Sequence, residues 1–159
     1  ILRYLRMGRL WETVRVRGGA YGASCSLDRL SGVLVFSSYR DPNVRETLAA
    51  YDSMAGYLRG LAPDSGELSR AVVGAIGDMD AYMLPDARGA RSLARYLTGL
   101  TEEERQKTRD EIFAVMPKHF REFADVLAEV ARKGAVCVLG GSRTEECAKA
   151  EGWPVRSLL

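Results

Sequence analysis

A basic and a phenolic side chain flank a glycine pair near the start of the chain. The stretch Val-Arg-Val-Arg-Gly-Gly-Ala-Tyr-Gly, residues 14–22, places Arg15 six positions before Tyr21, with Gly18 and Gly19 between them. A guanidinium and a phenol both donate hydrogen bonds, so together they could hold a peptide carbonyl oxygen and the oxyanion that forms from it. A structural role stays open at this point, because an Arg near a helix end also favours the helix dipole and a Tyr is common in strands.

The elements expected around this stretch would place the two side chains at a corner. An apolar stripe at helical spacing predicts an amphipathic helix over residues 2–16. The members of the stripe are Met7, Leu10, Trp11 and Val14. The glycine pair ends this helix, because glycine adopts the left-handed conformation without steric cost. From Tyr21 the apolar period changes to two, and strands over residues 21–27 and 33–39 predict a hairpin.

The remainder of the chain consists mainly of predicted helices. The expected helices cover residues 41–61, 67–76, 90–97, 101–116, 120–133 and 142–152, and further strands are expected over 135–139 and 153–158. Asp41-Pro42 starts the first of these helices, and capping boxes at Thr101 with Glu104 and at Ser142 with Glu145 start two others. This order predicts an α+β fold, a mainly antiparallel sheet with helices packed on one face, in a single domain over residues 1–159.

Composition narrows the class of protein. The chain has 159 residues, of which 47% are hydrophobic and 28% charged, as in one ordinary globular domain. Its net charge of +2 excludes a dedicated nucleic-acid binder. No apolar run approaches the ~20 residues that a membrane-spanning helix needs. We therefore expect neither a nucleic acid nor a membrane as a partner.

Few residues could bind a metal or act as a nucleophile. The single histidine, His119, excludes a multi-histidine metal site within this chain, and we predict a structural role for it. The three cysteines, Cys25, Cys137 and Cys147, have no C-x-x-C spacing and are expected to be reduced thiols. The glycine turn at residues 138–142 lacks the residues of a phosphate-binding loop, so a nucleotide site has little support.

Residues 1–40 carry a local excess of positive charge. Seven arginines stand against Glu12 and Asp28, which gives this segment a net charge of +5. Such a segment could face an acidic or carboxylate-bearing partner, or its arginines could simply solvate one helix face.

Several stretches together resemble a known family. They are Leu-Trp-Glu-Thr-Val-Arg-Val-Arg-Gly-Gly-Ala-Tyr-Gly at 10–22, Phe-Ser-Ser-Tyr-Arg-Asp-Pro-Asn at 36–43, Thr-Glu-Glu-Glu-Arg-Gln-Lys-Thr-Arg at 101–109 and Phe-Ala at 123–124. They resemble the C-terminal domain of presequence proteases, the single-chain branch of the insulinase/pitrilysin-type zinc metallopeptidases. The chain is thereby identified as the C-terminal part of the last domain of a larger multi-domain peptidase.

The resemblance implies a function for the corner. In this family two halves close over an unfolded peptide, and the zinc is bound by the N-terminal domain, so no metal is expected in this chain. Arg15 and Tyr21 match the catalytic pair that stabilises the transition state, and with Gly18 and Gly19 they are the implied substrate-binding residues. Arg17 fits the spacing less well. The implied partners are the N-terminal half of the same polypeptide and unfolded peptides, and the fragment alone is expected to be inactive.

Other functions stay open beside this one. The chain could be a non-catalytic peptide-binding or docking domain of an inactive homologue, and a nucleotide-binding domain is a third possibility. Abundant Arg and Ala with little Lys are typical of a GC-rich bacterial gene, so the expected location is the bacterial cytoplasm.

Overall fold

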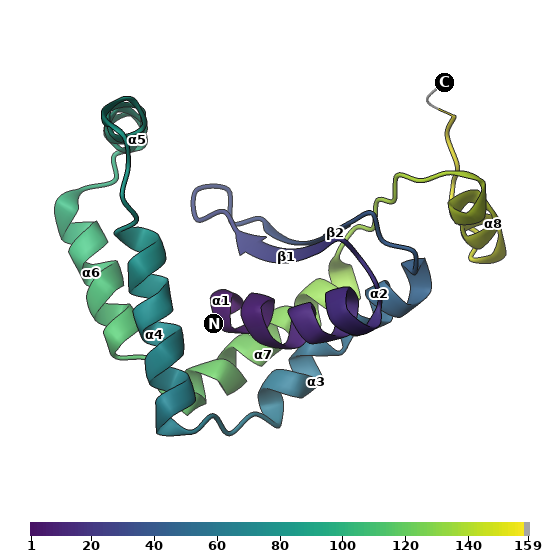
Figure 1. The fold of residues 1–159 in the computed structure, drawn as a ribbon, viewed down its shortest axis with the longest axis horizontal. Coiled ribbons are helices and arrows are strands. Elements are labelled where there is room, and N and C mark those ends of the chain that lie inside the picture. The colour runs from purple at the N-terminus through teal and green to yellow at the C-terminus, as the bar shows by residue number, and fades with distance from the viewer. Residues whose placement is uncertain (158–159) are drawn as a thin grey trace.

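The chain consists of one β-hairpin and a series of helices (Figure 1). The computed structural model describes residues 1–157. In chain order the elements are α1 (Leu2–Leu5), η1 (Arg6–Arg17), β1 (Gly22–Leu27), β2 (Leu34–Tyr39), α2 (Val44–Asp52), α3 (Met54–Arg59), α4 (Ser65–Met79), α5 (Pro85–Thr98), α6 (Glu102–Phe113), α7 (Pro117–Lys133) and α8 (Ser142–Ala150).

The hairpin carries helices on one face. β1 and β2 pair antiparallel along their whole length. Side chains alternate between the two faces of a strand, so Cys25 and the opposite Phe36 pack into the core, whereas Ser24 and the opposite Ser37 lie on the other face. η1 packs against β1, and Figure 1 places α3 and α7 on the same side of the hairpin. The predicted α+β fold, with an antiparallel sheet and helices on one face, is confirmed.

The first long helix is a π-helix, which changes the face that it buries. Over η1 the hydrogen bonds span five residues, and the pattern still holds where Gly18 N–H donates to Thr13 O at 3.0 Å. Such a helix repeats its face at intervals of four and five residues, which matches the buried series Leu5, Leu10 and Val14. The predicted α-helical stripe was therefore wrong in part, because Met7 and Trp11 are exposed.

The core lies where α1, η1, α3 and α7 meet under the hairpin. Its largest fully buried side chains are Leu5, Leu10, Val14, Met54, Leu58 and Phe120. The ring of Tyr4 meets Phe120 edge-on, with 5.3 Å between ring centroids. The helix predicted over residues 120–133 is present as α7, on which Phe120, Ala124 and Leu127 are buried.

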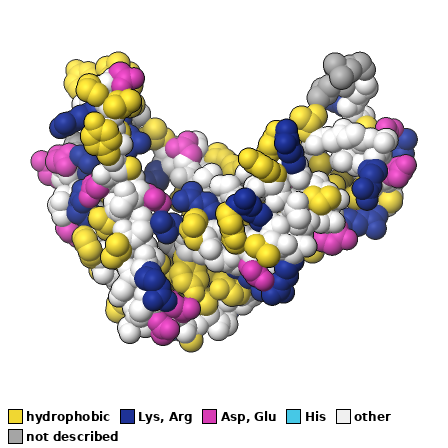
Figure 2. Space-filling model, in the orientation of Figure 1, with side chains coloured by type: hydrophobic (Ala, Val, Ile, Leu, Met, Phe, Trp, Pro, Cys, Tyr) yellow, Lys and Arg dark blue, Asp and Glu magenta, His cyan; other side chains and the backbone are white. Residues whose placement is uncertain are grey.

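Helices α4, α5 and α6 form an arm beside this core (Figure 1). All of their residues belong to the described part of the chain, and none of them is fully buried. The arm joins the core through α1 and α4, where Arg3 forms an ion pair with Asp78 at 2.9 Å. Figure 2 shows a broad hollow between the arm and α8, with apolar side chains gathered at the tip of the arm.

The last part of the chain differs from the prediction. Residues 135–139 were predicted as a buried strand, but they are irregular and exposed, because no strand among residues 1–157 pairs with them. The predicted capping box at Ser142 is also wrong, since Gly141 precedes α8 and no side chain caps it. The strand predicted over 153–158 is irregular as far as residue 157, and Leu158 lies outside the described residues.

The helix predicted over residues 41–61 begins later and is interrupted. α2 starts after Asn43 rather than at Asp41-Pro42, and Ser53 separates it from α3. In contrast, the capping box at Thr101 is present as predicted: Thr101 Oγ1 accepts from Glu104 N–H at 3.2 Å, and the Glu104 carboxylate accepts from Thr101 N–H at 2.9 Å.

Candidate functional site

Arg15 lies in the last turn of η1, beside an exposed indole. Its guanidinium carbon is 3.9 Å from the ring centroid of Trp11, well within the range of a cation–π contact. Trp11 is large and apolar but 42% exposed, so this contact lies at the surface. Arg15 itself is half-buried. The predicted catalytic guanidinium is thus held by an aromatic ring of its own helix.

The corner after η1 requires its two glycines for different reasons. A Cβ at Gly18 would lie 2.5 Å from the carbonyl oxygen of Val14, which is too close for any side chain. Gly19 has a φ of +76°, the left-handed conformation that glycine adopts without strain. The chain therefore turns sharply from η1 into β1, as predicted from the glycine pair.

A second loop fastens this corner. The side-chain amide of Asn43 donates to the carbonyl oxygen of Gly18 at 2.5 Å. Asn43 is held in turn by Asp41, whose carboxylate accepts from Asn43 N–H at 2.9 Å and from the hydroxyl of the buried Thr47 at 2.7 Å. The segment Tyr-Arg-Asp-Pro-Asn at 39–43 thus supports the glycine corner through hydrogen bonds to its backbone.

Tyr21 stands at the end of the hairpin with its ring largely in solvent. Its N–H donates to the carbonyl oxygen of Tyr39 at 3.1 Å, and its side chain is 66% exposed. The rings of Tyr21 and Tyr39 meet edge-on, with 6.0 Å between centroids. The guanidinium carbon of Arg40 lies 5.8 Å from the Tyr21 centroid and 5.4 Å from the Tyr39 centroid. We call Tyr21, Tyr39 and Arg40 the tyrosine–arginine cluster.

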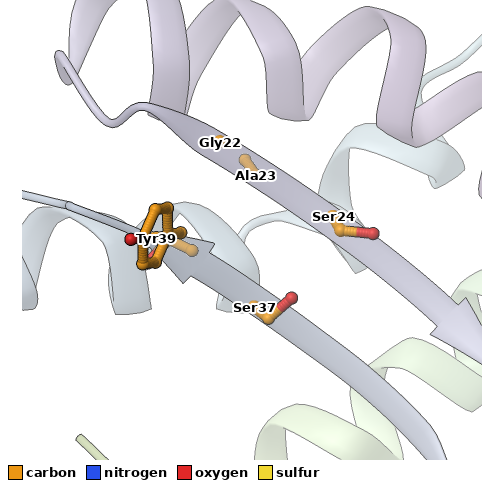
Figure 3. A pocket seen from close by; sticks show the side chains of 6 residues that line it. Gly22, Ala23, Ser24, Ser37 and Tyr39 are labelled. Atoms are coloured by element: carbon orange, nitrogen blue, oxygen red, sulfur yellow. The ribbon is translucent and has the colours of Figure 1, made fainter. Parts of the chain in front are cut away.

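A shallow pocket of about 230 Å³ extends from this cluster along the hairpin (Figure 3). It is lined by Gly22, Ala23, Ser24, Ser37, Ser38 and Tyr39. Figure 3 shows the hydroxyls of Ser24 and Ser37 on adjacent strands, with the ring of Tyr39 at one end. Small residues and hydroxyls leave room for an extended backbone and offer it hydrogen bonds.

The four predicted site residues lie in or beside the turn from η1 into β1, but the side chains of Arg15 and Tyr21 have different partners. Arg15 contacts Trp11, whereas Tyr21 contacts Tyr39 and Arg40. The sequence prediction missed the last two, and the signal that could have found them is the stretch 36–43, which carried part of the family resemblance.

Cys25 and His119, which the sequence analysis considered as a possible nucleophile and a possible metal ligand, have structural roles. Burial raises the pKa of the Cys25 thiol from 9.0 to about 11, so the group stays protonated at neutral pH. Its S–H donates to the carbonyl oxygen of Leu2 at 3.3 Å. His119 Nδ1 accepts from Met116 N–H at 3.0 Å at the start of α7, as expected of a structural histidine. Cys137, predicted in a buried strand, is exposed instead.

The described residues do not fit a zinc site. Residues 1–157 contain no group of three or more His, Cys, Asp or Glu side chains placed to hold a metal ion. Nor is any helix in the same range long and apolar enough to cross a bilayer.

Comparison with known proteins identifies the family. The family model described as the PreP C-terminal domain matches residues 1–142, which is most of the chain and ends where α8 begins. The chain belongs to the PreP C-terminal domain family. The predicted resemblance to presequence proteases is thereby confirmed.

Individual relatives agree with this assignment. Presequence protease 1, chloroplastic/mitochondrial, of Arabidopsis thaliana is 46% identical over 142 residues, which are 89% of this chain and 13% of that protein. The mitochondrial presequence protease of Emericella nidulans is 34% identical over 94% of this chain and 14% of its own length. Protein HypA of Clostridium perfringens is 35% identical over 82% of this chain and 13% of its own length. The chain thus spans about one seventh of the relatives that it matches.

The relatives correct one prediction. The chain was expected in a bacterial cytoplasm because of its Arg and Ala content, but the relatives include proteins named for chloroplasts and mitochondria. The prediction of a bacterial cytoplasmic location is therefore wrong. Amino-acid composition reflects the base composition of a gene and does not report where the protein acts.

Proposed function

We propose that the chain is part of the last domain of a zinc metalloendopeptidase that degrades unfolded peptides inside a closing chamber. Family membership supports a protease, and the names of several relatives designate presequence proteases. Zinc would be bound elsewhere in the longer polypeptide, because the described residues do not fit it. This chain alone is then inactive, and its contribution is made through its own side chains.

In this proposal Arg15 and Tyr21 donate hydrogen bonds to the oxygen of the scissile peptide carbonyl. The observation that carries the proposal is the braced corner: two obligatory glycines and the Asn43 bond hold the end of η1 and the start of β1 in a fixed relation. Within residues 1–157 neither Arg15 nor Tyr21 is paired with a carboxylate, so their donors are free to bind a substrate. Donors fixed in advance stabilise the charge that develops on the oxygen.

The partner proposed for this chain is the N-terminal half of the same polypeptide. The chain spans only about one seventh of its relatives, so most of such a protein lies outside it. On α5, Leu93, Tyr96 and Leu97 form an apolar stripe that is 58–83% exposed. An exposed stripe of this kind is typical of a protein interface. It supports a function in which this domain works against another part of the chain.

The proposal is tested with the variants Arg15→Ala and Tyr21→Phe in the longer polypeptide to which this chain is proposed to belong, which we call the full-length parent. We expect unchanged zinc content and peptide hydrolysis reduced about tenfold or more in each variant, because each loses one donor to the oxyanion. Arg17→Ala and Tyr82→Phe are matched controls: Arg17 is paired with Glu12 at 2.9 Å, and Tyr82 is 87% exposed on the arm. Full activity in both test variants would remove the assigned role.

The same measurements address the alternative, a peptide-binding or docking domain without catalysis. If the full-length parent binds unfolded peptides but contains no zinc and cleaves none of them, the domain belongs to an inactive homologue. Arg15→Ala would then weaken peptide binding instead of lowering a rate.

A further inference from the structure

Arg40 has an unusual backbone. Its φ is +48°, and it is the one non-glycine residue with a positive φ that residues 1–157 contain. This left-handed region crowds the Cβ of an L-residue, so the conformation is strained and has to be compensated by its surroundings. Asn and Asp tolerate the region better than Arg does. A long basic side chain at this position therefore has to be explained.

The compensation comes from the two loops that meet at the corner. Tyr21 N–H bonds Tyr39 O on one side of Arg40, and Asn43 bonds Gly18 O on the other side. The carboxylate next in sequence, Asp41, is occupied by Asn43 and Thr47. The backbone of Arg40 is thus held between Tyr39 and Asn43, both of which are hydrogen-bonded to the corner. The neighbouring carboxylate of Asp41 is not the partner of the Arg40 guanidinium.

The strained backbone directs the guanidinium toward two rings. Its carbon lies 5.8 Å from the Tyr21 centroid and 5.4 Å from the Tyr39 centroid, both within the ~6 Å range of a cation–π contact. Both rings are exposed, at 66% and 60%. Because both rings are this exposed, burial does not restrain them. The ring of Tyr21 is held by its contact with the Arg40 guanidinium and by its edge-on contact with the ring of Tyr39.

We infer that Arg40 is a positioning residue for Tyr21: it fixes the ring of the donor and keeps a positive charge beside it. This inference rests on the proposed role of Tyr21. A donor whose ring is held before the substrate arrives loses less conformational freedom when it binds the oxyanion. The nearby guanidinium of Arg40 also favours the negative charge that develops on the carbonyl oxygen to which Tyr21 donates. Both effects act on the transition state, so Arg40 should affect kcat more than KM.

The test uses Arg40→Gly in the full-length parent. Glycine adopts the positive φ without strain, so this variant removes the side chain and retains the backbone. We expect kcat to fall about fivefold to tenfold, KM to change less than about twofold, and Tm to stay the same or rise. Arg40→Lys should recover part of kcat, because it keeps the charge. Arg29→Gly, at the other end of the hairpin and bonded to Thr108, is the matched control and should keep wild-type kcat.

A double variant separates this inference from the proposed function. If Arg40 acts through Tyr21, then Arg40→Gly combined with Tyr21→Phe should be no slower than Tyr21→Phe alone. Independent, multiplying losses would overturn the inference, and so would wild-type kcat in Arg40→Gly or a fall in Tm that accounts for its loss of activity. If instead Tyr21→Phe itself is fully active, the proposed function has failed at Tyr21.

Discussion

The half of the chain around η1 and α7 and the arm of α4, α5 and α6 are both helical, yet they bury their apolar residues very differently. The first half contains the largest fully buried side chains, among them Leu10, Leu58 and Phe120. The arm, which is described throughout, has no fully buried residue. Its helices are nonetheless well formed, with capping boxes at Asp64 and Thr101. Local signals are sufficient to define helices, whereas burial depends on what surrounds them.

The comparison separates what this chain stabilises by itself from what it presents to something else. The proposed site residues Arg15 and Tyr21 belong to the buried half and are attached to its core through η1 and β1. The exposed stripe of α5 belongs to the arm. We therefore expect substitutions in the first half to alter stability, and substitutions in the arm to alter association with the rest of the parent.

The largest effect is expected from truncating the core. Phe120→Ala removes a ring that is 1% exposed and should lower the free energy of unfolding by about 3–5 kcal/mol, through lost burial and the cavity that remains. Urea denaturation measures the change. A loss below about 1 kcal/mol would mean that the core is less tightly packed than the structure indicates.

The next effect depends on pH and again belongs to the buried half. The pKa of Cys25 is raised to about 11 by burial, above its ordinary 9.0, so the unfolded chain loses this proton first as the pH rises. The stabilisation is complete below about pH 9 and is lost as the pH rises from 9 to about 11. Unfolding measured across this range should show a steeper decline than in Cys25→Ala, which lacks the thiol. Equal slopes would contradict the assigned burial.

A smaller and local effect is expected in the arm. Thr101→Ala removes the hydroxyl that caps α6 and should cost about 1 kcal/mol. Because α6 has no buried residue, the loss should appear as faster hydrogen exchange in α6, with exchange in α7 unchanged. If α7 exchanged faster as well, the arm and the core would form one cooperative unit, and the distinction drawn between them would be wrong.

The smallest effect on stability is expected on α5. Leu97→Ala, at a side chain 73% exposed, should change the free energy of unfolding of this chain by less than about 0.5 kcal/mol. In the full-length parent the same variant should weaken the closed state if α5 contacts the other half. Small-angle scattering of the parent with and without peptide would show this as a smaller change in radius of gyration.

Sequence patterns predicted the elements whose signals are local. Alternation indicated the hairpin, and the pairing of Thr101 with Glu104 indicated the start of α6. The pattern failed in η1, because α-helical spacing was assumed where the bonds span five residues, and Met7 was wrongly placed inside. It failed again at residues 135–139, since an apolar run becomes a strand only when another strand pairs with it.

For the candidate site, the sequence likewise predicted the turn but not the contacts between side chains. Gly18 and Gly19 turn the chain between η1 and β1 as expected, with Arg15 before the turn and Tyr21 after it. The roles of Arg15 and Tyr21 stay a prediction. The contacts of Arg40 could not be predicted, because no local sequence preference places an arginine in the left-handed conformation. Its conformation depends on hydrogen bonds between loops that are far apart in sequence, such as Asn43 to Gly18.

The hairpin has a consequence for handling this protein. Within residues 1–157 β1 and β2 pair only with each other, so each has an outer edge whose backbone groups have no strand beside them. Such edges are templates for adding strands from other molecules, and they promote aggregation. The exposed run at 135–139, rich in valine, is a segment that could add to such an edge. This chain is therefore expected to self-associate through these edges when it is expressed on its own.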